Sequence, residues 1–159
     1  MCNKCFNGAG LGRKITIYTD GASRGNPGMS ASGFAVYEDG KLLKRLSKYN
    51  GIKTNNFAEY TAIMLALKWC ANTLEDIKDV EINLYSDSEL VVRQLDGRYR
   101  VRSAEMKRLN EAVHRLKDMF GSVTFANRRR SDSGVSAVDK GLNELLDRVE
   151  ADPNNTNKY

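Results

Sequence analysis

The sequence predicts one α/β domain, built on a mixed five-stranded sheet with helices on its flanks. Three strand-like runs come first, and the hairpin signal Asp39-Gly40 separates the second from the third. Two later strand-like runs each lie between segments with helical periodicity. The resulting order, βββαβααβα, places three antiparallel strands before the crossover connections of parallel strands, which are nearly always right-handed.

The three early strands and the first helix follow one another closely. In the first strand apolar and polar side chains alternate, and Asp20 stands where a glycine-rich segment begins. The first helix is opened by Asn55-Asn56 and repeats its apolar residues every three to four positions. The expected ranges are 14–20, 33–38 and 41–49 for the strands and 57–72 for the helix.

The second half of the chain alternates strands with helices. The strand EINLYS precedes a short helix, for which Gly97 is the expected C-cap. A longer helix follows and is stopped by Gly121, and after the strand SVTFAN an arginine-rich loop leads to the last helix. The expected ranges are 81–86 and 122–127 for the strands and 88–97, 103–120 and 137–149 for the helices.

The bulk composition favours a globular protein with a polyanionic partner. A chain of 159 residues can bury a core of its own, and its 41% hydrophobic and 28% charged residues are ordinary for soluble domains. Residues 1–12 lack the apolar stretch of a secretory signal, and no apolar run approaches the roughly 18 residues of a membrane span. We therefore expect a cytoplasmic protein without a membrane anchor. Its net charge of +5 favours binding to polyanions.

The cysteines do not point to a disulfide framework or to a finger-like metal site. Cys2 and Cys5 form a CxxC motif, but a closed zinc site needs about four ligands. The chain offers only Cys70 and His114 besides, at no finger-like spacing. A non-essential leader is the simpler interpretation, with zinc binding as the alternative. The predicted parts of the chain are a flexible leader over residues 1–13, a folded domain over 14–150 and a polar, frayed tail over 151–159.

Four carboxylates stand where this fold could bring them together, although each has a local alternative. Asp20 could belong to an Asp-Gly turn, and Asp87 could cap the helix that follows it. Glu59 and Asp139 each lie three residues after an asparagine or a serine that could open a capping box. Taken singly, any of the four could therefore be structural.

The joint placement of the four acids indicates a metal site. Two lie at strand ends and two in the first turns of predicted helices, and functional sites in open α/β sheets collect at the carboxyl ends of strands. Clustered carboxylates without a cation repel one another. Oxygen ligands without His or Cys favour Mg²⁺ or Mn²⁺, and two such ions about 4 Å apart can activate a water and stabilise the leaving oxygen of a phosphodiester. A basic protein with this cluster is predicted to be a nuclease.

Four blocks of the sequence resemble type 1 ribonuclease H, in order and in spacing. They are YTDGASRGNPG, TNNFAEYTAIMLAL, SDSELVVRQLDG and VDKGLNELLD, within about residues 14–149. The resemblance implies the ribonuclease H fold, which agrees with the element order. It also implies an Mg²⁺-dependent endonuclease, with Mn²⁺ as the alternative metal. Such an enzyme hydrolyses the RNA strand of RNA–DNA hybrids with two metal ions and leaves 5′-phosphate and 3′-hydroxyl ends.

The resemblance also assigns residues to the site. The acids that match the family's catalytic and metal-binding residues are Asp20, Glu59, Asp87 and Asp139. Asn26, Asn55 and Asn56 match positions that contact the hybrid backbone, and Thr54 is similar to part of a pocket for a DNA phosphate. For the fourth acid, Asp132 is the competing assignment.

The chain departs from the family pattern in the loop before the last helix, where many members have a histidine. The one histidine, His114, falls in a predicted helix, where we expect a structural or solvent-exposed role. The loop instead has Arg128, Arg129 and Arg130, which we expect to contact substrate phosphates. A simply solvated loop is the alternative for these arginines.

Two further functions remain open on the sequence alone. One is a hybrid-binding module of the same fold without catalysis, although a binder has no reason to keep a repulsive cluster of acids. The other is a nuclease of the same superfold that acts on DNA or on double-stranded RNA. We expect a monomer whose partner is an RNA–DNA hybrid.

Overall fold

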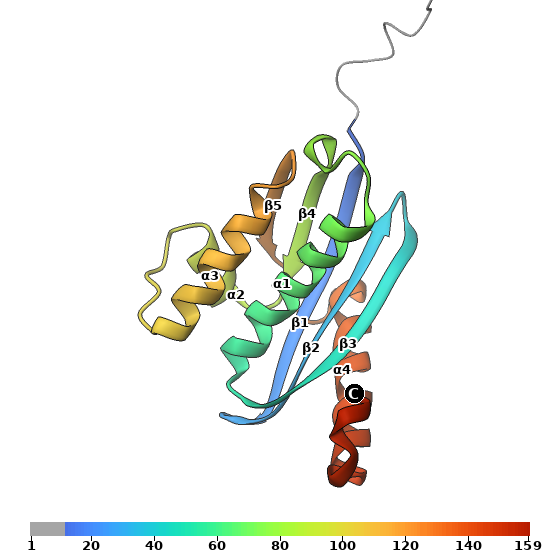
Figure 1. Ribbon diagram of the computed structural model, residues 1–159, viewed down its shortest axis with the longest axis vertical. Coiled ribbons are helices and arrows are strands. Elements are labelled where there is room, and N and C mark those ends of the chain that lie inside the picture. The colour runs from blue at the N-terminus through green and yellow to red at the C-terminus, as the bar shows by residue number, and fades with distance from the viewer. Residues whose placement is uncertain (1–11) are drawn as a thin grey trace, which may run out of the picture.

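The computed structural model describes residues 12–159, which have the predicted order of elements (Figure 1). The Cys2–Cys5 motif lies outside the described residues. The strands are β1 (Lys14–Gly25), β2 (Gly28–Glu38), β3 (Lys41–Lys53), β4 (Glu81–Ser86) and β5 (Ser122–Asn127). The helices are α1 (Asn55–Thr73), α2 (Glu89–Leu95), α3 (Ala104–Lys117) and α4 (Ser133–Ala151), with the 3₁₀ helices η1 (Ile77–Asp79) and η2 (Pro153–Lys158).

The five strands form the predicted mixed sheet, in which their order is β3-β2-β1-β4-β5. β1 pairs antiparallel with β2 and parallel with β4, so the central strand joins the meander to the crossover half. α1 and α3 cover one face over the main apolar cluster, and α4 crosses the other face over a smaller one (Figure 1). No helix within residues 12–159 is long and apolar enough to cross a membrane.

The predicted hairpin and the two later strands are confirmed. Asp39 and Gly40 form the turn between β2 and β3 with φ angles of 50° and 75°, as two-residue hairpin turns require. β4 and β5 have the predicted bounds and pair in parallel from Glu81 opposite Ser122 to Ser86 opposite Asn127. Their carboxyl ends therefore lie at the same edge of the sheet.

The first strand is longer than predicted. Its pairing with β2 continues past Asp20 to Gly25, and residues 26–27 make the turn. The glycine-rich segment is therefore strand, and the alternative of a turn at Asp20 is wrong. Gly21 is needed because α1 crosses β1 at this point: a Cβ on Gly21 would overlap the backbone nitrogen of Glu59.

The capping alternatives for two of the acids are also wrong. The N-cap of α1 is Thr54, whose side chain accepts a hydrogen bond from the N–H of Phe57, so Glu59 does not complete a capping box with an asparagine. The N-cap of α2 is Ser88, and Asp87 lies before it. Neither carboxylate is therefore explained by its own helix.

The last helix begins at Ser133, four positions before the predicted start. Its N-cap is Asp132, which accepts a hydrogen bond from the N–H of Gly134 at 3.0 Å. The sequence indicated a loop because Gly134 is a weak helix former. In the structure the glycine is inside the helix because the ring of Tyr18 lies where a Cβ would be. Asp139 consequently lies inside α4 and does not belong to a capping box.

Both ends of the described chain are held by side-chain contacts. Arg13 donates two hydrogen bonds to Glu38, at 2.7 and 2.8 Å. The tail, expected to be frayed, instead forms η2, and Tyr159 packs against the cluster beneath α4. The guanidinium of Arg148 lies 5.9 Å from the centre of the Tyr159 ring. Polar composition alone did not reveal this aromatic anchor.

We expect Gly21→Ala to destabilise the protein by about 1–3 kcal/mol, because its methyl group would push α1 away from β1. The matched control is Gly141→Ala in α4, where the nearest neighbour is the movable Ser47 hydroxyl at 3.0 Å. Alanine favours the helix by up to about 1 kcal/mol there, so a much smaller change is expected. Urea unfolding measures both variants, and a wild-type midpoint for Gly21→Ala would contradict the close contact.

Candidate active site

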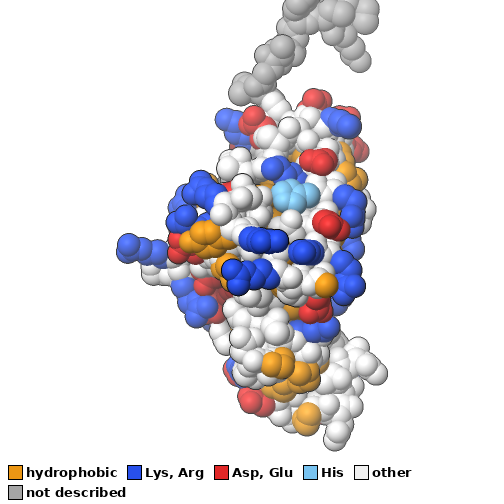
Figure 2. All heavy atoms as spheres, turned by 90° about the vertical axis from the view of Figure 1, so that its left-hand side faces the viewer, with side chains coloured by type: hydrophobic (Ala, Val, Ile, Leu, Met, Phe, Trp, Pro, Cys, Tyr) orange, Lys and Arg blue, Asp and Glu red, His pale blue; other side chains and the backbone are white. Residues whose placement is uncertain are grey.

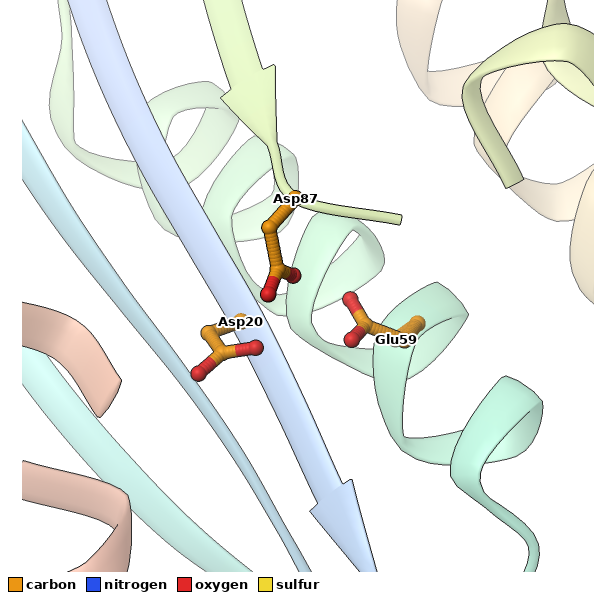
Figure 3. A group of neighbouring side chains, drawn as sticks. All are labelled: Asp20, Glu59 and Asp87. Atoms are coloured by element: carbon orange, nitrogen blue, oxygen red, sulfur yellow. The ribbon is translucent and has the colours of Figure 1, made fainter. Parts of the chain in front are cut away.

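Three carboxylates meet where α1 crosses the sheet. Figure 3 shows Asp20 on β1, Glu59 on α1 and Asp87 directly after β4, with their side chains directed toward one another. One oxygen from each lies within 4.8 Å of those of the other two. Asp20 is 0% exposed and Glu59 2%, whereas Asp87 is half-buried. The structure thus brings together three of the four predicted acids as one compact group.

The sheet and the helix each fix part of this group. β1 and β4 are paired in parallel up to Thr19 and Ser86, so the residues that follow, Asp20 and Asp87, lie next to each other. The hydroxyl of Ser86 donates a hydrogen bond to Glu59 Oε2 at 3.4 Å and accepts one from the N–H of Ser88. Sequence analysis missed Ser86, for which the SDS pattern at a strand end was the available signal.

The group is electrostatically costly without a cation. The pKa of Asp20 is raised by burial first and then by the charges of Glu59 and Asp87. The pKa of Glu59 is raised by burial and by Asp87, although the N–H of Gly21 partly opposes this. Within residues 12–159, Asp20 Oδ2 and Asp87 Oδ1 are buried without a hydrogen-bond partner. An all-oxygen donor set with unpaired oxygens fits a hard divalent cation.

The fourth predicted acid, Asp139, approaches from α4. It does not belong to the group that lies within 4.8 Å, but it faces Asp20 closely enough to raise the pKa of Asp20 further. The competing residue, Asp132, caps α4 and forms an ion pair with Arg128 at 3.3 Å. Of the two, the structure brings only Asp139 to the cluster.

The arginine loop reaches the cluster through one side chain. Arg130 Nε donates a hydrogen bond to Asp87 Oδ2 at 3.0 Å, while the Arg130 side chain remains 66% exposed. The guanidinium of Arg128 lies 4.2 Å from the centre of the Tyr85 ring, and Arg129 is exposed. The contact of Arg130 with an acid of the cluster was not predicted.

The remaining predicted residues gather at the start of α1. Asn26 Oδ1 accepts a hydrogen bond from the N–H of Asn55 at 3.0 Å, and Thr54 caps the helix. Asn56 lies in the same first turn. His114 lies on α3, half-buried, in the helical position expected of it. Thr54, Asn55 and Asn56 thus lie in the segment that leads to Glu59, and Asn26 bonds to it from the turn between β1 and β2.

Comparison with known proteins gives a consistent family. The RNase H family model matches residues 12–132. Ribonuclease HI of Halobacterium salinarum is 32% identical over 136 residues, which are 84% of this chain and 66% of that protein. The crystal structure of RNase H1 from the same organism aligns with a TM-score of 0.78 at 32% identity, covering 85% of this chain and 98% of that one.

A further solved structure, LC11-RNase H1 in complex with an RNA/DNA hybrid, aligns with a TM-score of 0.79 at 33% identity. That alignment covers 85% of this chain and 98% of the other. The chain spans less than the full length of its curated relatives: 66% of the Halobacterium protein and 30% of the bifunctional protein Rv2228c of Mycobacterium tuberculosis. The family model nevertheless matches well over half of the residues, with the fold and the acidic cluster in agreement, and the chain belongs to the ribonuclease H family.

Proposed function

We propose that this protein is an endonuclease that hydrolyses the RNA strand of RNA–DNA hybrids, with Mg²⁺ as its metal and Mn²⁺ as a substitute. The products carry 5′-phosphate and 3′-hydroxyl ends. The observation that carries the proposal is the buried group of three carboxylates with two unpaired oxygens. The family membership and the hybrid bound to LC11-RNase H1 support the choice of substrate.

Four acids have the metal-binding role in this proposal. Asp20 and Asp87 are held by neighbouring strands, Glu59 by α1, and Asp139 by α4 from the other face of the sheet. Two divalent ions bound there would activate a water and stabilise the leaving oxygen of the RNA phosphodiester. The protein's own contribution is to hold the carboxylates in place despite their mutual repulsion.

Substrate contacts come from two sides of the cluster. Asn26, Thr54, Asn55 and Asn56 would hold the hybrid backbone near the start of α1, and the arginines of the loop would hold phosphates. Figure 2 shows that Lys and Arg side chains outnumber acidic ones on the side where α2 and α3 lie. The exposed cations of α3 and of the segment before it are Arg98, Arg100, Arg102, Lys107, Arg108 and Arg115. Such a surface suits a polyanion.

The deciding experiment compares labelled RNA–DNA hybrid, duplex RNA and duplex DNA, each with chelator, Mg²⁺ or Mn²⁺. Cleavage of the RNA strand of the hybrid alone, and only with metal, is expected. Binding without cleavage would favour the hybrid-binding module, and cleavage of DNA or duplex RNA would favour a different nuclease. The expectations of a monomer and of a cytoplasmic location are part of the same proposal.

We expect Asp20→Asn to lower the cleavage rate at least about a hundredfold, because it removes a metal ligand, while hybrid binding in Ca²⁺ survives. In chelator the same variant should be more stable than wild type by about 1 kcal/mol, because the amide is neutral without the proton uptake on folding that the raised pKa of Asp20 requires. Single-turnover kinetics, hybrid binding and urea unfolding measure the three effects. A near-wild-type cleavage rate would show that the site is assigned wrongly.

The fourth acid is tested by two variants on the same helix. Asp139→Asn should lower the cleavage rate at least about tenfold with unchanged stability. Asp132→Ala should keep the rate and lose about 1 kcal/mol of stability, because it removes the N-cap of α4. Kinetics at saturating hybrid together with thermal melting separate the two effects. The reverse result would transfer the role to Asp132.

Replacing Arg128, Arg129 and Arg130 together by alanine should weaken hybrid binding and reduce its salt dependence, because phosphate contacts determine that slope. Each lost contact is worth roughly one unit of the slope of log K against log salt. His114→Ala, which removes a half-buried side chain on α3, is the control and should leave the slope unchanged. An unchanged slope in the triple variant would favour a merely solvated loop.

A further inference from the structure

Of the three clustered carboxylates, Glu59 is the one that lies on a helix and not on or next to a strand of the sheet. Asp20 and Asp87 follow directly on paired residues of β1 and β4, so the hydrogen bonds of the sheet fix their separation. Glu59 lies on α1, and its charge is repelled by that of Asp87. Without a bond between the sheet and residues 58–59 of α1, this repulsion would move Glu59 away from the other two acids.

A buried serine on β2 forms a hydrogen bond of this kind. Ser32 is 0% exposed, and its Oγ donates a hydrogen bond of 2.6 Å to the carbonyl oxygen of Ala58, the residue before Glu59. Ser32 pairs with Gly21, the position at which β1 has no side chain because α1 is in contact. Thus β1 leaves room for residues 58–59 of α1, and β2 bonds to the same part of the helix.

A second residue orients the serine. Asn50 Nδ2 donates a hydrogen bond of 2.7 Å to Ser32 Oγ, so the single proton of that hydroxyl is directed to Ala58. Asn50 lies where the pairing of β3 with β2 shifts register, next to Gly51, whose φ is 78°. A bulge at such a place often redirects a side chain toward a site.

We propose that Ser32 and Asn50 are positioning residues, which hold Glu59 close enough to Asp20 and Asp87 for the three carboxylates to bind a divalent metal together. This inference rests on one part of the proposed function, the binding of a divalent metal, and does not depend on the substrate. Neither residue has to touch the metal or the substrate, since each acts through the backbone of α1. Outer partners of this kind typically change metal affinity by about 10- to 100-fold when removed.

The same strand contains a matched control. Ser30 is also 0% exposed, and its hydroxyl also donates to a backbone carbonyl, that of Gly51 on β3 at 3.1 Å. Ser30→Ala and Ser32→Ala therefore remove the same atom from the same strand, but only Ser32 bonds to α1. A merely structural role predicts similar losses of melting temperature and equal metal affinities for the two variants.

The experiment is isothermal titration calorimetry of Mg²⁺ and of Mn²⁺ into the folded, substrate-free protein. Ser32→Ala should bind metal about tenfold more weakly than wild type, at the low end of the range for outer partners, whereas Ser30→Ala should bind like wild type. The half-buried Asn50→Ala should weaken binding in the same direction, and it provides the test should Ser32→Ala fold poorly. Cleavage should need a correspondingly higher metal concentration for half its maximal rate and recover at saturating metal.

Metal affinities of Ser32→Ala and Asn50→Ala equal to that of Ser30→Ala would overturn the positioning role and leave the proposed function standing. Failure of the wild-type protein itself to bind metal at Asp20, shown by an unchanged titration for Asp20→Asn, would overturn both. A wild-type titration that responds to Asp20→Asn and to Ser32→Ala, but not to Ser30→Ala, is the expected result.

Discussion

The contact between β1 and residues 58–59 of α1 determines much of this structure. The two backbones meet at Gly21, where a side chain would overlap residues 58–59, and the contact brings Glu59 beside Asp20. It requires β1 to continue as a strand beyond Asp20, since a turn there would remove the surface on which α1 lies. It also accounts for the long, unbroken pairing of β1 with β2, because Ser32 opposite Gly21 must reach the same part of α1.

The stability of the fold must offset the repulsion that this contact creates. Burial raises the pKa of both Asp20 and Glu59, which is the sign of carboxylates whose charge is poorly solvated in the native state. The apolar cluster between the sheet and the helices α1 and α3 contains Tyr60, directly after Glu59 on α1, and Ile63, four residues after it. Hydrophobic burial on one side of the helix thus holds a charged side chain near other charges. The stability lost to this repulsion is a common cost of a preorganised site.

The sequence predicted the order of elements, the hairpin at residues 39–40 and three of the clustered acids, because these depend on local periodicity, turn chemistry and a recognisable family pattern. It failed where distant segments decide the local structure. The glycines after Asp20 indicated a loop, because the sequence does not show that Gly21 is in contact with α1. Gly134 likewise argued against a helix, because the sequence does not show that the ring of Tyr18 packs against this position. Ser32 and Asn50 carried no signal at all, since their importance depends on a hydrogen bond to a backbone carbonyl in another element.

Arg130, which is paired with Asp87 at the cluster, is suited to binding a phosphate and not to transferring a proton. Arg130 is always charged, so it cannot transfer a proton at neutral pH as a histidine in this loop could. Its ion pair with Asp87 is 66% exposed on the arginine side, and exposed pairs contribute at most about 1 kcal/mol. A divalent cation shared by several buried carboxylates interacts far more strongly than one solvated guanidinium. Arg130 therefore gives up little by leaving Asp87, which makes it suited to a phosphate at the edge of the site.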